Sequence, residues 1–296
     1  MSRYEYIDSQ RAVPANPYPT SKMCLWLEVS TAGFYDWRSR PQSATAARRE
    51  VLCERIKHFF DASHGTYGYR RVHADLVEDG TPCSPELVRS LMASLGLVAC
   101  QPRPFRVTTQ ADGHASITDH VKRDFTADRP GVKFVGDITY IHTWQGFLYL
   151  ATVIDCYSKK VVGWSIADHM RAELAENALR NAAASTTIEA NAIFHSDRGS
   201  VYTSADYRAL VAKLGMRSSM GRTGVCWDNA QAETFFSALK NERVHRTVYA
   251  THAQARRDVI AYIEGFYNTC RRHSALNYRR PNEVHYSYQP PDSAAA

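Results

Sequence analysis

Apolar residues recur at helical spacing through the first third of the chain. Those within 46–60 return every three or four positions, as one face of a helix requires. A second helix is expected over 70–79, and a third opens at Ser84 and Pro85, because Ser caps helices well and Pro fits the first turn. Gly96 ends it. Helix, turn and Arg-bearing helix is the layout of a helix-turn-helix DNA reader, although a small bundle that only packs has the same pattern.

The segments around these helices carry weaker patterns. The first twenty residues hold three prolines and few apolar groups, so we expect extended chain there. Residues 24–37 are apolar with a break at Gly33, which predicts a short helix and a turn. Residues 101–130 hold prolines and basic side chains without a sustained period and are expected to form a linker.

The second half of the chain changes to short β-rich runs that alternate with helical patterns. A turn at 143–146 separates the first two runs, and the second is apolar nearly throughout, as a strand buried on both faces would be. We expect strands over 133–142, 147–155, 160–167, 191–196 and 216–220, and helices over 171–184, 204–214, 229–243 and 252–268. This order predicts an α/β domain, a mixed five-stranded sheet with helices on both faces.

The pattern divides the chain into five parts. We expect an N-terminal extension with a short helix (1–45), a helix-turn-helix-like helical domain (46–100), a linker (101–130), the α/β domain (131–285) and a disordered tail (286–296). The length of 296 residues is enough for two domains, one of which buries a full core.

Positive charge flanks a near-neutral centre. Residues 1–106 carry 14 Lys/Arg and 11 Asp/Glu, residues 107–239 carry 13 and 14, and residues 240–280 carry 9 and 3. Basic flanks suit a protein that grips a polyanion around a site whose own acids hold cations. Solvated helix faces give the same charge pattern, so charge alone leaves both interpretations open.

The seven cysteines and the N-terminus narrow the class of protein. The cysteines are scattered and form no C-x-x-C pair, so we expect buried free thiols in a reducing compartment rather than a zinc finger or a disulfide framework. The chain begins Met-Ser-Arg-Tyr-Glu without an apolar signal region, and its longest apolar run is far short of a membrane span. A cytoplasmic protein is expected.

Three acids stand out by their positions. Asp137 interrupts a strand of Val, Ile, Tyr and Phe, where an Asp has poor propensity and is costly to bury unless something such as a cation compensates its charge. Asp197 follows the fourth expected strand, and Glu233 lies in a helix that a glycine-containing loop precedes. The 35-residue gap between Asp197 and Glu233 is weak evidence by itself; the structural context of the three acids carries the weight.

At this point the chain resembles a known family over nearly its whole length. The segments HGTYGYRR (64–71), FHSDRGSVYTS (194–204) and CWDNAQAETFFSALKNE (226–242), and the tail 267–281, are similar to those of bacterial insertion-sequence transposases. They most resemble the second-reading-frame protein of the IS-three family, within the retroviral integrase catalytic core superfamily.

The resemblance implies a fold, an activity and partners. It implies an RNase H-like core over 131–285 and transfer of DNA strands, dependent on two Mg²⁺ ions, with Mn²⁺ as a substitute. Asp137 would bridge the ions and Asp197 and Glu233 would each complete one side, so all three are both catalytic and metal-binding. The partners implied are element ends and target DNA, a second copy of the chain, and a companion upstream-frame protein or fusion. The companion is expected because the family's fusion transposase carries a separate upstream helix-turn-helix and leucine-zipper region, in addition to the part that this chain resembles.

The chemistry explains the choice of residue type. Two Mg²⁺ ions about 4 Å apart lower the pKa of the attacking water or 3′-hydroxyl and stabilise the leaving oxygen of a phosphodiester. Hard cations of this kind take oxygen ligands, which carboxylates supply. Ordinary surface or capping roles for all three acids are the alternative.

Several neighbours of the acids carry further expectations. Asp228 is expected to be the N-cap of the Glu233 helix, with Gln231 completing a capping box. Asn229, one turn before Glu233, would touch substrate or orient Glu233, or serve only as a first-turn residue. Lys240, two turns after Glu233, would contact phosphate or lie solvated. For His195 we expect a structural or DNA-contact role rather than metal ligation.

The DNA contacts are assigned to basic and polar groups along the chain. The segment that holds Arg271 and Arg272 could follow the DNA backbone. Packing of the tyrosines in this segment against the final helix is an equally good account of its sequence. The residues assigned are Asn229, Lys240, Arg70, Arg71, Arg89, Arg271 and Arg272.

Three functions are compatible with this sequence. The first is a transposase that cleaves and transfers DNA strands. The second is a hydrolytic RNase H-like nuclease, which would not need a hundred-residue helical arm. The third is a non-catalytic DNA-binding remnant or regulator of a mobile element, although all three acids are present.

Overall fold

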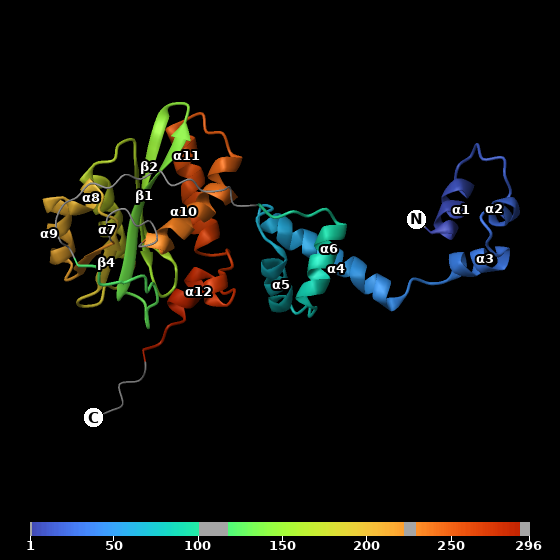
Figure 1. Cartoon of the computed structure of the whole chain (residues 1–296), viewed down its shortest axis with the longest axis horizontal. Coiled ribbons are helices and arrows are strands. Elements are labelled where there is room, and N and C mark those ends of the chain that lie inside the picture. Colours follow the sequence, from blue (N-terminus) through green and yellow to red (C-terminus); the bar gives the residue numbers. More distant parts are fainter. Residues whose placement is uncertain (1, 101–117, 222–228, 291–296) are drawn as a thin grey trace, which may run out of the picture. The chain divides into compact units, whose positions relative to one another are not determined.

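The computed structural model of the chain describes residues 2–100, 118–221 and 229–290 (Figure 1). The chain divides into two compact units, Met1–His58 and Phe59–Ala296. Most of the expected linker and the end of the expected tail therefore lie outside the described residues. Across the described parts, no helix is long and apolar enough to cross a membrane.

The N-terminal unit begins with a helix where extended chain was expected. Helix α1 (Arg3–Arg11) starts from a capping box in which the Ser2 hydroxyl accepts a hydrogen bond from the Glu5 amide at 3.1 Å and the Glu5 carboxylate accepts one from the Ser2 amide. These bonds satisfy amides that a helix otherwise leaves without partners. The expectation was wrong because it weighed the prolines, all of which follow this helix, above the capping box.

Two more short helices complete this unit. Helices α2 (Thr20–Trp26) and α3 (Thr31–Ser39) stand where one helix and a turn were expected. Gly33 lies inside α3 and does not break it, because its amide donates to the N-cap hydroxyl of Ser30. The side chains buried together in this unit are Ile7, Met23, Cys24 and Phe34.

The three helices expected next are all present. They are α4 (Ala44–Ala62), α5 (Tyr69–Glu78) and α6 (Pro85–Ser94). The hydroxyl of Ser84 caps α6 by accepting from the Leu87 amide at 3.2 Å. Helices α5 and α6 pack on each other.

A mixed sheet of five strands, in the order β3-β2-β1-β4-β5, forms the centre of the second unit. Figure 1 labels three of these strands, β1, β2 and β4. The first three strands run antiparallel to their neighbours, and β4 and β5 extend the sheet in parallel. The strands are β1 (Lys133–Thr143), β2 (Gly146–Asp155), β3 (Val161–Ala167), β4 (Ile193–Ser196) and β5 (Arg217–Met220). The expected fold class, a mixed five-stranded sheet with helices after a helical domain, is confirmed.

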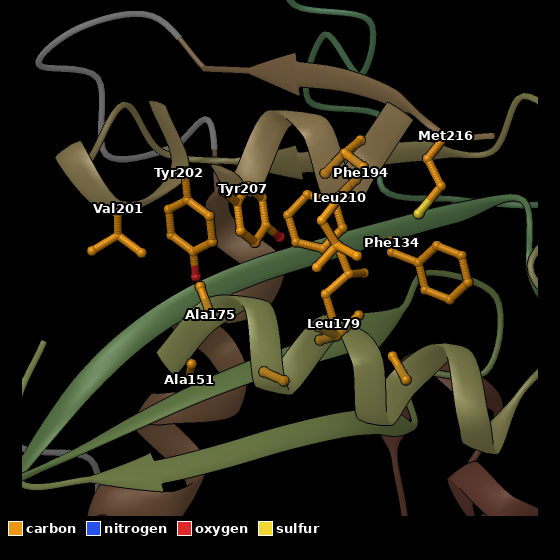
Figure 2. Close-up of a cluster of buried hydrophobic side chains, with 14 of the residues drawn as sticks. Phe134, Ala151, Ala175, Leu179, Phe194, Val201, Tyr202, Tyr207, Leu210 and Met216 are labelled. Atoms are coloured by element: carbon orange, nitrogen blue, oxygen red, sulfur yellow. The ribbon is translucent and has the colours of Figure 1, made fainter. Parts of the chain in front are cut away.

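Helices α7 (Ala172–Ser185), α8 (Ser200–Thr203) and α9 (Ala205–Lys213) cover one face of the sheet. Figure 2 shows Phe134 and Phe194 from the strands meeting Leu179 and Leu210 from these helices. Burial of such aromatic and aliphatic surface is the main stabilising contribution to the domain.

Helices α10 (Ala230–Glu242) and α11 (His252–Ile260) contact β1 and lie on the other side of the strands from α7 (Figure 1). Helix α11 continues as a π-helical segment over Ala261–Tyr267, which the sequence pattern did not reveal. The remaining short elements are η2 (Val244–Arg246), η4 (Ser274–Leu276) and α12 (Pro281–Tyr286).

Candidate active site

Asp137 lies on β1 just beyond the point where β4 stops pairing with it. The β4 register covers only residues 133–135 of β1, so one edge of the strand is released from the ladder before Asp137. One carboxylate oxygen accepts a hydrogen bond from the Ile138 amide at 2.8 Å. Burial raises the pKa of Asp137 to about 8, and the charge of Asp197 adds to this rise.

Asp197 follows directly after β4, as expected. Because β4 is parallel to β1 and His195 pairs with Val135, Asp197 comes level with Asp137 just beyond the paired residues. Its carboxylate accepts from the Gly199 amide at 3.0 Å and remains exposed at the rim. The protein around it still raises the pKa of Asp197, chiefly by removing water from one side of the carboxylate.

Glu233 lies in the first turn of α10, and the N-cap of that helix fixes it against β1. The cap residue is Asn229, whose buried side-chain amide donates to the carbonyl of Gly136 at 3.1 Å. Gly136 immediately precedes Asp137, so a single hydrogen bond joins the Glu233 helix to the Asp137 strand. Burial raises the pKa of Glu233.

The structure corrects the expected capping box at the start of this helix. Asp228 lies outside the described residues, and the N-cap is Asn229. Gln231 makes no cap: its amide donates to the Asp155 carbonyl at 3.4 Å and its oxygen accepts from the Lys159 ammonium at 2.8 Å. Asn229 is likewise buried and bound to the strand backbone, which favours the orienting role over the contact with substrate.

Lys240 is a cation whose charge lowers the pKa of Asp137. Burial lowers the pKa of Lys240, and the charge of Asp137 opposes that effect. Its ammonium lies 5.0 Å from the centre of the Tyr140 ring.

The three acids share one electrostatic neighbourhood but do not form a finished metal cage. Asp197 and Glu233 both raise the pKa of Asp137, so the carboxylates repel one another when ionised. Within the described ranges, no three His, Cys, Asp or Glu side chains are grouped closely enough to hold a metal ion as they stand. Asp137 and Asp197 instead accept hydrogen bonds from their own loop or strand. An oxygen-only donor set with mutually repelling charges suits a hard divalent cation.

The structure corrects two of the expected DNA contacts. Arg271 is buried and forms a bidentate ion pair with Glu242, with nitrogen–oxygen distances of 2.5 to 3.0 Å. Arg272 is buried and bound to Asp75 at 2.6 Å and to Glu78. Both guanidinium groups are thus paired with carboxylates of the protein itself, which argues against their assignment as DNA contacts.

The remaining basic residues differ in exposure. Arg71 is half-buried, 3.7 Å from Glu242, whereas Arg70 and Arg89 are exposed on α5 and α6. Arg70 donates to the Tyr69 hydroxyl at 3.1 Å, and Arg89 pairs with Glu86 one turn away. Exposed pairs of this kind exchange readily with solvent and leave the two arginines accessible.

His195 is structural, one of the two roles expected for it. It is fully buried on β4, and its Nδ1 shares a hydrogen bond of 2.8 Å with the Ser219 hydroxyl on β5.

The sequence interpretation missed the Asn229–Gly136 bond and a set of aromatic side chains at the end of the β1–β2 hairpin. Tyr140 and Trp144 are both exposed there. The signal available was their position: two large aromatic residues at the solvent-facing end of a strand that also carries Asp137.

The chain matches known family models along most of its length. Residues 127–226 and 214–281 match two models described as integrase core domain, and residues 47–105 match a model described as HTH-like domain.

Curated relatives are similar over nearly the whole chain. The chain is 36% identical over 275 residues to the transposase InsF for insertion sequence IS3A of Escherichia coli (strain K12), covering 92% of this chain and 94% of that one. It is 35% identical over 245 residues to the transposase for insertion sequence element IS904 of Lactococcus lactis subsp. lactis (strain IL1403), covering 82% and 97%. A chain of the simian T-cell lymphotropic virus intasome, in complex with PP2A regulatory subunit B56 gamma, is similar at 16% identity and a TM-score of 0.49 over 81% of this chain and 78% of its own.

Proposed function

The chain belongs to the IS3 family of insertion-sequence transposases, and from this premise we propose that it cuts and joins DNA strands as a DDE-type enzyme whose acids are Asp137, Asp197 and Glu233. The observation that carries the assignment is the parallel register of β4 on β1, which brings Asp197 level with Asp137. The raised pKa of Asp137, to which both Asp197 and Glu233 contribute, supports placing the three acids in one site.

The donor set supports two Mg²⁺ ions as the cofactor, with Mn²⁺ as a substitute. Asp137 would hold both ions, and Asp197 and Glu233 one each. When bound, such ions lower the pKa of the attacking water or 3′-hydroxyl and stabilise the charge on the leaving oxygen. Their positive charge would also relieve the repulsion among the three carboxylates, which Lys240 only partly offsets at Asp137.

The chain's own residues hold the substrate and the acids in position. The Asn229–Gly136 hydrogen bond keeps Glu233 beside Asp137. Lys240, whose ammonium interacts electrostatically with Asp137, would bind a phosphate close to the reacting bond. In the helical domain over 46–100, the exposed Arg70 and Arg89 would bind the DNA backbone, and the half-buried Arg71 would contribute less.

The oligomeric state and the cellular location follow from the proposed reaction. Joining two element ends to a target requires more than one active site, so we propose a multimer that also draws on an upstream-frame companion for sequence recognition. The substrate would be bacterial DNA, as the names of the relatives indicate for them, which puts the reaction in the cytoplasm.

A strand-joining assay tests the assignment. Purified protein, with the upstream partner fused where needed, is mixed with labelled terminal-repeat DNA and Mg²⁺ or EDTA. Joined product is expected only with Mg²⁺, and Asp137→Asn, Asp197→Asn and Glu233→Gln should each abolish it while DNA binding survives.

Matched controls show whether a loss of joining comes from removing any negative charge or from removing one at the site. Asp128 and Glu173 are exposed acids away from the site, so Asp128→Asn and Glu173→Gln should join DNA normally. Undiminished joining by any one of the three site variants would remove that residue from the assignment.

A further inference from the structure

A groove of about 270 Å³ lies at the end of the β1–β2 hairpin, outside the acidic triad. It is lined by residues of β1 and the turn after it, by Lys240 of α10, and by the segment that follows α10. This volume lies just below the range of roughly 300–1,000 Å³ that holds drug-sized ligands, so the groove suits a single flat ring system. The residues that matter to its chemistry are Tyr140, His142, Trp144, Lys240, His245 and Tyr249.

The groove exists because the sheet is incomplete there. Strand β4 pairs with β1 only over 133–135, so the far half of β1 lacks a neighbouring strand on that side. The segment after η2 returns to this edge, where the Trp144 amide donates to the Tyr249 carbonyl at 3.1 Å. The Gln145 side chain also accepts from the His252 amide at 2.8 Å. Two hydrogen bonds thus hold the outer wall, and a notch remains between them and α10.

The lining pairs open aromatic rings with a cation. The exposed fractions of Tyr140 and Trp144 are 56% and 74%, which is unusual for side chains of this size. Tyr249 is buried, and its hydroxyl donates to the Asp258 carboxylate at 2.6 Å, so it forms a rigid floor. The Lys240 ammonium lies over the Tyr140 ring.

Lys240 links the groove to the acids. Tyr140 is three residues beyond Asp137 on the same strand, roughly 10 Å along the chain, and its side chain leaves the opposite face because side chains alternate along a strand. Lys240 lines the groove and also interacts electrostatically with Asp137. A nucleotide next to the reacting phosphodiester would therefore reach the groove without leaving the site.

We propose that this groove binds an unpaired nucleobase at the end of the DNA, stacked on Tyr140 and Trp144, with the adjoining phosphate on Lys240. Every base has a π-face that stacks on aromatic side chains, whereas a base inside a duplex is already stacked on both sides and a terminal base pair is too wide for a groove of about 270 Å³. The charge complementarity between Lys240 and phosphate favours this occupant over an apolar ligand. The inference rests on the proposed function for its substrate, DNA.

Binding to matched DNA ends tests the groove without requiring catalysis. Fluorescence anisotropy in EDTA compares a labelled duplex with a three-nucleotide unpaired end and the same duplex fully paired. The full chain should prefer the unpaired end, and Trp144→Ala or Tyr140→Ala should reduce that preference by about fivefold or more, the usual effect of one lost stacking contact. 2-Aminopurine in the unpaired end should be quenched by the full chain and not by Trp144→Ala.

The control is Trp26→Ala, an exposed tryptophan of the N-terminal unit. Any change that it causes in affinity should be equal for the two DNAs and leave their ratio unchanged. Because Trp144 is largely exposed, thermal unfolding of Trp144→Ala should match the parent, and Trp144→Phe should keep most of the preference.

The outcomes separate the two ideas. Normal Mg²⁺-dependent joining with an unchanged end preference in Trp144→Ala would overturn the groove and leave the transposase assignment intact. Lost preference together with absent joining in the parent protein would support the groove and count against the catalytic assignment. An equal loss of affinity for both DNAs in Trp144→Ala would also overturn the proposal, because a contact with paired DNA or with another chain gives that pattern.

Discussion

At the scale of single residues, Asp137 is a carboxyl group whose surroundings destabilise its ionised form. The native surroundings of Asp137 raise its pKa to about 8, first by burial and then by the charge of Asp197. Between the ordinary value of 3.8 and about 8, the folded protein therefore binds a proton that the unfolded chain releases. Without a cation, stability should fall as pH rises through this window.

The first prediction is that Asp137→Asn stabilises the cation-free protein at pH 8 by about 1–2 kcal/mol. The amide has a similar shape and no charge to desolvate. Urea unfolding in EDTA at pH 8 and at pH 4.5 measures the effect, which should shrink at the lower pH. The exposed Asp128→Asn serves as control and should change little. A variant less stable than the parent at pH 8 would contradict this account.

Single residues also mark what sequence can and cannot reveal. Asp137 was identified because a lone acid in an apolar strand is visible in the pattern itself. Arg271 and Arg272 were misassigned because their partners are remote: Glu242 is 29 residues from Arg271, and Asp75 is 197 residues from Arg272. Sequence reports the charge of a side chain, whereas burial and pairing depend on the finished fold.

At the scale of elements, two close contacts set the geometry of the core. Asn229 joins α10 to β1 through the Gly136 carbonyl. On the opposite face, Gly163 of β3 lets α7 approach, since a Cβ there would lie 2.3 Å from the Ala178 oxygen and 2.5 Å from the Ala182 nitrogen. The helices and strands themselves were predictable from periodicity, but neither contact was, because each depends on two elements distant in sequence.

A second prediction concerns the position of Glu233. Asn229→Ala removes the hydrogen bond to Gly136, so α10 is free to shift against β1, and joining should fall by about tenfold or more, because small displacements of reacting groups are costly. DNA affinity should stay within about twofold, since the side chain is buried. Ser237→Ala, exposed on the same helix, is the control. Weakened DNA binding with unchanged turnover would return Asn229 to a DNA-contact role.

A third prediction tests the packing of α7 on β3. Gly163→Ala forces the new methyl group into the α7 backbone, which cannot rotate away, so the free energy of unfolding should fall by about 1–3 kcal/mol. Gly265→Ala is the matched control: nothing lies within 4 Å of its Cβ position, and a helical Ala is favoured over Gly. Urea denaturation of both variants checks the difference. Equal stability of Gly163→Ala and the parent would show that α7 shifts without cost.

At the scale of the whole second unit, charged side chains form ion pairs between elements that are distant in sequence. Helix α5 of the helical domain contributes Asp75 and Glu78 to Arg272. Arg71 of the same helix approaches Glu242, the last residue of α10. Arg271 and Arg272, two of the nine Lys and Arg in 240–280, are therefore paired inside the protein, which no count of Lys and Arg reveals.

Glu242 is the centre of this network, and it carries the last prediction. Its carboxylate accepts from Arg271 and from the Tyr262 hydroxyl at 2.8 Å. Glu242→Ala leaves Arg271 buried without its partner, so unfolding should become easier by about 3–5 kcal/mol. Glu283→Ala, which breaks a half-exposed pair with Arg279, should cost no more than about 1 kcal/mol.

The pH dependence distinguishes the ion pair from simple packing. Burial alone would raise the pKa of Glu242, but the hydrogen bonds and charge of Arg271 lower it overall. An acid with a lowered folded pKa stabilises the native state above its ordinary value of 4.5 and loses that contribution as pH falls through the folded value. The difference between the parent and Glu242→Ala in urea unfolding should therefore be constant from pH 6 to 7.5 and shrink below pH 4.5. A difference that persists unchanged in acid would mean that Glu242 acts through its volume, and the charged link between α5 and α10 would not be what stabilises this unit.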